Sequence, residues 1–188
     1  MGRVLIHFRP KTIRDRGTRR LACETADSFI HAGVWALILI NLVVRNFYIP
    51  SGSMIPTLLV HDSLLVNKFI YRVSQPNRGD IIVFRPPIDP NRDFIKRVIG
   101  LEHDLIEVRD GVLYRNGLRV DEPYLNEPLM NQDMEPVRVP EGELFMMGDN
   151  RNNSNDSRFW GGAPVKDVVG KATVIIYPPT RWRWIHTR

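Results

Sequence analysis

Apolar positions are distributed unevenly along the chain, with one continuous run near the front and short β-branched runs behind it. Residues 29–44 carry no full charge, although His31 and Asn41 interrupt the apolar pattern, and Arg45 follows directly. With its flanking residues this stretch approaches the roughly 20 residues that a helix needs to cross a bilayer. The pattern therefore predicts a single transmembrane anchor over residues 28–47.

A cleavable signal peptide or a buried helix of a soluble domain could also produce such a run. A signal peptide needs small residues at its cleavage positions, but bulky residues follow the run in the sequence RNFYIP. We therefore expect the anchor to be retained. Because the run is short and carries polar residues, the buried helix stays open as an alternative.

Basic residues are concentrated ahead of the apolar run. Residues 1–27 contain seven Lys and Arg residues against three acidic ones, within a chain whose net charge is +5. Because Lys and Arg accumulate on the cytoplasmic side of membrane proteins, we expect residues 1–27 to be a cytoplasmic segment and residues 48–188 to lie outside the cytoplasm. The same placement of charge argues against a nucleic-acid partner, which would need a basic face on the folded domain.

Short strand-like segments alternate with turns behind the apolar run. Apolar and β-branched residues favour strands over residues 62–73, 81–85, 93–100, 105–108, 112–120, 143–147 and 171–177. Asp-Gly and Asn-Gly pairs at residues 110–111 and 116–117 are typical of tight hairpins, and residues 121–140 form a polar, proline-containing excursion. We predict a mainly β fold, a folded antiparallel sheet or partial barrel, behind one N-terminal transmembrane helix.

Lys96 occupies the middle of an otherwise apolar strand face, between Phe94 and Val98. Burial disfavours the ammonium form and would lower the pKa of this lysine towards neutrality, where a neutral amine can act as a general base. On its own, the pattern is more typical of a lysine on the solvent face of a half-exposed strand.

Ser51 and Ser53 flank Gly52 in a loop that Pro50 and Pro56 enclose. A serine hydroxyl needs an activating base, and an amine can take the place of the more familiar histidine. The Ser51 hydroxyl and the Ser53 backbone N–H could then donate to a developing oxyanion. Taken alone, Ser-Gly-Ser is typical of an ordinary turn.

Other chemistries have little support in the sequence. It contains no HExxH motif, no Cys/His cluster and no glycine-rich phosphate loop, so we expect neither a metal nor a cofactor. Cys23 is the one cysteine, which excludes an intramolecular disulfide.

Four blocks follow the apolar run in a fixed order: IPSGSMIPTL, RGDIIVF, DFIKRVIG and GDNRNNSNDSRFWG. Together they resemble the type I signal peptidases of bacteria, and the resemblance covers residues 49 to about 176. It implies a β-rich serine endopeptidase without a cofactor, on the outer (periplasmic) face of the cytoplasmic, or inner, membrane. Such an enzyme removes N-terminal signal peptides from exported preproteins at small-x-small sites such as Ala-x-Ala. The implied partners are preprotein signal peptides and membrane lipid, with the secretion translocon as a further candidate.

The resemblance also assigns roles by position. Ser53 is the implied nucleophile and Lys96 the general base, while the Ser51 side chain and the Ser53 N–H form the oxyanion hole. Ser154 matches a serine that hydrogen-bonds and orients the lysine. Asp156 with Arg158, and Asp149 with Arg97, match supporting ion pairs, and the apolar walls of shallow substrate pockets fall on Phe47, Ile49, Pro50, Met54 and Ile95.

Three further functions are compatible with parts of this pattern. The same dyad would serve a specialised processing peptidase, of the conjugation type or of an organelle inner membrane. A membrane-tethered binding module could share the fold without catalysis. A self-cleaving transcriptional repressor also uses Ser-Lys chemistry, but residues 1–27 are too short for a helix-turn-helix head.

Overall fold

The computed structural model describes residues 24–25, 27–37, 43–127 and 129–186. The chain divides into two compact units between Leu42 and Val43. In the first unit, residues 24–25 and 27–37 are helical. Across the described residues, no helix combines the length and apolar character needed to cross a membrane. Residues 1–23 and 38–42, which belong to the predicted cytoplasmic segment and the predicted anchor, lie outside the described residues.

The end of the predicted anchor, residues 44–47, is part of a strand. Strand β1 (Val44–Tyr48) pairs antiparallel with β2 (Ser63–Asn67), with Val44 opposite Asn67 and Tyr48 opposite Ser63. Backbone hydrogen bonds of these residues are therefore made to the sheet. Residues 44–47 therefore belong to the second unit and are not helical, contrary to the predicted end of the anchor.

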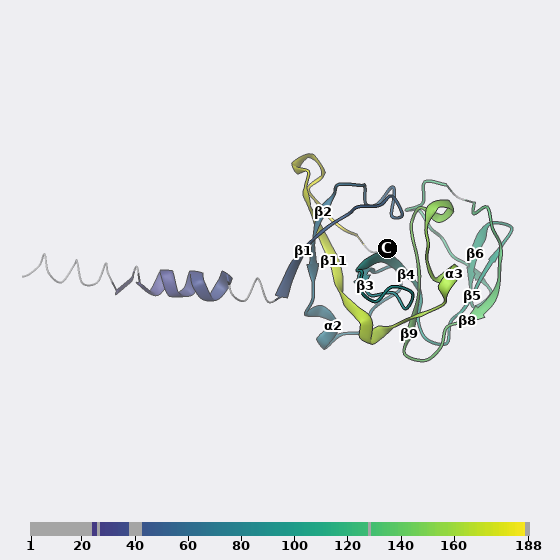
Figure 1. Cartoon of the computed structure of the whole chain (residues 1–188), viewed down its shortest axis with the longest axis horizontal. Coiled ribbons are helices and arrows are strands. Elements are labelled where there is room, and N and C mark those ends of the chain that lie inside the picture. The colour runs from purple at the N-terminus through teal and green to yellow at the C-terminus, as the bar shows by residue number, and fades with distance from the viewer. Residues whose placement is uncertain (1–23, 26, 38–42, 128, 187–188) are drawn as a thin grey trace, which may run out of the picture. The chain divides into compact units, whose positions relative to one another are not determined.

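A large antiparallel sheet forms the main body of the second unit, in the order β1-β2-β11-β3-β4-β9-β10, with β12 added to β11. Figure 1 labels its strands β1, β2, β11, β3, β4 and β9. Its remaining strands are β3 (Ile81–Phe84), β4 (Phe94–Gly100), β9 (Glu143–Met147), β10 (Ala163–Pro164), β11 (Val168–Tyr177) and β12 (Arg183–Trp184). The sheet curls, so the prediction of a mainly β, folded antiparallel architecture is confirmed.

A second, four-stranded sheet has the order β7-β6-β5-β8 and contains β5 (Leu105–Arg109), β6 (Val112–Arg115), β7 (Leu118–Arg119) and β8 (Met134–Arg138). Asp110 and Gly111 connect β5 to β6 with φ values of 51° and 72°, and Asn116 and Gly117 connect β6 to β7 with 54° and 78°. Positive φ at both central residues is what tight hairpins of the Asp-Gly and Asn-Gly kind require. Both predicted hairpins are confirmed.

Other segments also differ from the predicted pattern. The strand predicted over residues 62–73 ends at Asn67, whose side-chain oxygen accepts hydrogen bonds from the N–H groups of Phe69 and Ile70 and so begins the short helix α2 (Ile70–Val73). The excursion over residues 121–140 contains β8, which pairs with β5. The other short helices are η1 (Arg151–Asn153), α3 (Ser157–Trp160), η2 (Val165–Asp167) and η3 (Pro179–Arg181).

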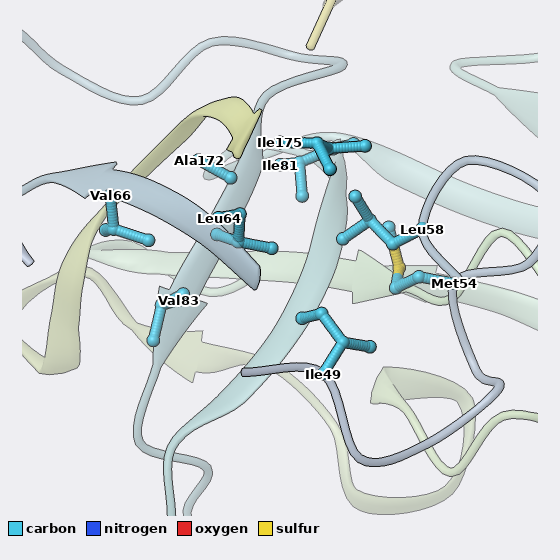
Figure 2. Packing of buried hydrophobic residues seen from close by; sticks show 9 residues of the cluster. All are labelled: Ile49, Met54, Leu58, Leu64, Val66, Ile81, Val83, Ala172 and Ile175. Atoms are coloured by element: carbon cyan, nitrogen blue, oxygen red, sulfur yellow. The ribbon is translucent and has the colours of Figure 1, made fainter. Parts of the chain in front are cut away.

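The loop after β1 is held by the hydrophobic core of the large sheet. Ile49, Met54 and Leu58 point from this loop towards side chains of β2, β3 and β11 (Figure 2), and each is at most 2% exposed. A fully buried side chain of this size contributes about 1.5–3 kcal/mol. The segment that carries Ser51 and Ser53 is thus fixed by apolar contacts on both sides.

Candidate active site

The loop after β1 and strand β4 bring Ser53 and Lys96 together. The Lys96 Nζ lies 2.6 Å from the Ser53 Oγ. Lys96 lies on β4, where it pairs with Ile82 of β3, and only 4% of its surface is exposed. A buried amine is therefore hydrogen-bonded to a hydroxyl that a loop of the core presents to it.

Burial lowers the pKa of Lys96 from 10.5 to about 8. The negative charges of Asp156 and Asp149 act in the opposite direction and raise this pKa, while the positive charge of Arg158 lowers it. Desolvation is the largest of these effects, because the ammonium form loses its hydration when the side chain is buried. Near pH 8 a substantial fraction of the amine is neutral and can accept a proton.

Hydrogen-bond donors for a developing negative charge lie beside the Ser53 hydroxyl. The Ser51 Oγ is 3.5 Å from the Ser53 Oγ. The Ser53 backbone N–H has no acceptor among the described residues. Both groups are therefore available to an oxygen that develops charge during attack by Ser53.

A groove of about 810 Å³ opens over this pair. Four of the predicted pocket residues, Phe47, Ile49, Pro50 and Ile95, line it. One side of β4 is unpaired here, because β3 pairs with β4 from Phe94 onwards whereas β9 pairs with it only from Arg97. An extended chain could add to this free edge as a further strand.

Met54 does not belong to the groove, contrary to the prediction. Its side chain is fully buried in the core next to Leu58 (Figure 2) and is absent from the groove lining. Ser53 and Met54 are the central residues of a turn closed by the Ile55 N–H and the Gly52 carbonyl, and the Met54 side chain lies on its core side. A neighbour of the candidate nucleophile thus contributes to core packing.

Ser154 lies beside Gly148, but its predicted hydrogen bond to Lys96 is not formed. The Ser154 Oγ is buried and has no hydrogen-bond partner in the described part of the chain. A Cβ placed on Gly148 would overlap both this Oγ and the Ser53 carbonyl oxygen. Ser154 and the backbone of Ser53 therefore meet at a position where only glycine fits.

Gly148→Ala should lower the free energy of unfolding by about 1–3 kcal/mol, the usual cost of overpacking a filled site. The added methyl group would overlap the Ser53 carbonyl oxygen, which belongs to the backbone and cannot move without shifting the whole loop. Urea unfolding of the variant and of Gly142→Ala compares the two sites. Gly142 has free space around its Cβ but a φ of +71°, so its substitution reports backbone strain without overlap.

Both predicted ion pairs are present. Arg97 and Asp149 form a buried two-point contact with N–O distances of 2.8 and 2.6 Å. Arg158 holds Asp156 in the same way at 2.8 and 2.9 Å, and Asp156 also accepts the Gly148 N–H at 3.0 Å. The second pair thereby fixes the backbone next to Ser53.

Glu122, Tyr124 and Arg151 belong to the surroundings of the site, although the sequence does not predict them there. Arg151 donates to the Gly148 carbonyl at 2.9 Å and to Glu122 at 2.9 and 2.6 Å. The Tyr124 ring lies 3.8 Å from the Arg97 guanidinium, a favourable cation–π contact. Glu122 and Tyr124 come from the polar excursion, where nothing in the sequence separates them from solvated residues.

Within the described residues, no group of three or more His, Cys, Asp or Glu side chains is arranged to hold a metal ion.

Comparison with known proteins gives consistent matches. The family model described as "Signal peptidase, peptidase S26" matches residues 22–177. "Probable signal peptidase I-1" of Synechocystis sp. is 46% identical over 166 residues, which cover 85% of this chain and 84% of that protein. "Signal peptidase I" of Leptolyngbya laminosa is 40% identical over 171 residues, which cover 83% of this chain and 84% of that protein. "Thylakoidal processing peptidase 1, chloroplastic" of Arabidopsis thaliana is 41% identical over 71% of this chain and 42% of its own length.

Proposed function

We propose, from the premise that this chain belongs to the signal peptidase family, peptidase S26, that Ser53 is its nucleophile and Lys96 its general base. As a member of this family, the protein is a serine endopeptidase that removes signal peptides. The observation that carries the proposal is the 2.6 Å contact between Lys96 Nζ and Ser53 Oγ at a site where burial lowers the pKa of the amine.

The geometry supports a two-step acyl transfer. Neutral Lys96 takes the proton of Ser53 while the Oγ attacks the scissile carbonyl carbon, and the oxyanion receives hydrogen bonds from the Ser51 hydroxyl and the Ser53 N–H. The Lys96 ammonium then gives its proton to the leaving amine, and the C–N bond breaks. Water attacks the resulting ester with Lys96 as base, which releases the signal peptide and restores Ser53.

Substrate selection follows from the free edge of β4 and the apolar lining of the groove. An extended preprotein segment paired with Phe94–Lys96 would place alternate side chains on the same face. Ile49 and Ile95 line the same groove as Ser53. We infer that the side chains before the scissile bond at alternate positions are small, as in Ala-x-Ala sites.

The rate should rise with pH if neutral Lys96 is the base. With a pKa of about 8, the neutral fraction and hence kcat/KM should increase roughly 50-fold between pH 6 and pH 8 and level off above it. A synthetic preprotein peptide with an Ala-x-Ala site, assayed across this range, measures the profile. A rate that is flat from about pH 6 to 9 would contradict the assignment of Lys96.

Membrane attachment is a further part of the proposal. The charge excess of residues 1–27 favours a cytoplasmic N-terminus and a catalytic domain on the extracytoplasmic side of the cytoplasmic membrane. Lipid is then a direct partner and the secretion translocon a candidate one. Carbonate washing of membranes tests the attachment, since an anchored chain stays in the membrane fraction until detergent is added.

A thylakoid-type processing peptidase is a second candidate, because a relative with this name is 41% identical to the chain. The dyad chemistry would be the same. A panel of exported and thylakoid-lumen preproteins, cleaved in parallel by the purified protein, distinguishes the two by their relative kcat/KM values.

A further inference from the structure

Asn150 is hydrogen-bonded to the backbone on both sides of Ser53. Its side-chain Nδ2 donates to the Gly52 carbonyl at 3.0 Å, and its backbone N–H donates to the Ser53 carbonyl at 3.0 Å. One residue therefore holds the two peptide planes that meet at the Ser53 Cα. The direction of the Ser53 side chain depends on these two planes.

The Gly52–Ser53 peptide carries the candidate oxyanion donor. It is trans, since the cis bonds of the described chain are Ile55–Pro56 and Tyr177–Pro178. In a planar trans peptide the carbonyl and the N–H point in opposite directions. A hydrogen bond that holds the Gly52 carbonyl towards Asn150 thereby turns the Ser53 N–H to the other side, where it has no acceptor among the described residues.

A second donor to the same carbonyl shows what Asn150 adds. The Ile55 N–H also bonds the Gly52 carbonyl, at 3.2 Å, but it comes from the same turn and fixes only the internal shape of the turn. Asn150 instead follows β9, which pairs with β4, the strand of Lys96. Its bonds set the orientation of the turn relative to the lysine.

The preceding residues make this support rigid. Gly148 is held by Asp156 through its N–H and by Arg151 through its carbonyl, and Asp149 is held by Arg97. Asn150 itself does not line the groove. Its position suits a residue that acts through Ser53 and leaves the substrate untouched.

We propose that Asn150 is a positioning residue that aims the Ser53 N–H at the oxyanion of the transition state. This inference rests on the proposed role of Ser53 as nucleophile. The Ser53 N–H acts as a donor only when charge develops on the substrate oxygen. Asn150 should therefore contribute to kcat and not to substrate binding.

Asn150→Leu removes the amide while keeping a branched side chain of similar size. We expect kcat to fall about 10- to 100-fold, because the donor is misdirected without being removed. We expect KM to stay within about threefold and the midpoint of the pH profile to stay at the wild-type value. Asn150→Asp keeps the shape but points an oxygen at the Gly52 carbonyl, so its kcat should fall at least as far; it also provides the test if Asn150→Leu does not fold.

Asn152→Leu is the matched control. Asn152 lies in the same loop, and its amide donates to the Leu129 carbonyl at 3.3 Å and to Glu127, away from Ser53. Its kcat should stay within about threefold of the wild type. Such a result shows that loss of an amide in this loop is not enough to slow the reaction.

The outcomes separate this inference from the function on which it rests. Cleavage that persists in Ser53→Ala contradicts the nucleophile itself. If Ser53→Ala is inactive while a folded Asn150 variant keeps its kcat, only the positioning role is overturned. A rise in KM as large as the fall in kcat, or a shifted pH midpoint in Asn150→Leu, also overturns it, because either result indicates general disturbance of the site.

Discussion

Cleavage of a preprotein with an Ala-x-Ala site should fall by about 10⁴-fold or more when Ser53 is replaced by alanine or Lys96 by methionine. The first change removes the attacking oxygen. The second keeps most of the aliphatic length of the lysine and removes only the amine that lies 2.6 Å from that oxygen. The measurement is kcat/KM of the detergent-solubilised chain. Wild-type activity in either variant would require a different nucleophile or base.

Two lysine variants complete this experiment. Lys96→Arg should be as inactive as Lys96→Met, because a guanidinium does not lose its proton at working pH. Lys166→Met, outside the groove, should keep its activity within about threefold. A Lys96→Arg enzyme with substantial activity would show that the cation, and not a neutral base, is what the reaction needs.

Loss of activity in Lys96→Met should not come from unfolding. The pKa of Lys96 drops from 10.5 to about 8 on folding, so its charged form destabilises the fold at every pH below about 8. This cost, roughly 3 kcal/mol, disappears as the pH rises towards 10.5. The methionine variant should therefore unfold at higher urea concentration than the wild type at pH 6, and the difference should shrink at alkaline pH.

Local sequence chemistry accounts for much of the fold. Asp110-Gly111 and Asn116-Gly117 are predictable as hairpins because few residues other than Gly, Asn and Asp accept positive φ. The strand that carries Lys96 is predictable from its apolar and β-branched residues, Ile95, Val98 and Ile99 among them. By contrast, β8 escapes prediction, because residues 134–138 are largely exposed and lack an apolar period.

The surroundings of the dyad depend on contacts that no local pattern contains. Met54 follows Ser53 directly in the sequence, which predicts that it lines the groove. In the structure the Met54 side chain is instead buried in the core. Arg151 bonds Glu122 across 29 positions, and Asn150 bonds Gly52 across 98. Side chains of this kind look like solvated loop residues until the sheet brings distant segments together.

Asp149→Ala should lower the free energy of unfolding by about 3–5 kcal/mol. The change leaves Arg97, whose side chain is 1% exposed, as a buried cation without its carboxylate. The guanidinium keeps its hydrogen bond to the Gly79 carbonyl and its contact with the Tyr124 ring, but neither of these groups carries a full negative charge. Urea unfolding at neutral pH measures the loss.

The double variant Arg97→Met with Asp149→Leu separates the charge from the packing. With both charges removed, most of the lost stability should return, since a buried pair can be replaced by apolar side chains at little cost. Asp89→Ala serves as the exposed control: its partner Arg92 is 79% exposed, so stability should change by less than about 1 kcal/mol. If the double variant were as unstable as Asp149→Ala, the decisive contribution would be the fit of the side chains between β4 and the loop after β9. An unpaired charge would then not explain the loss.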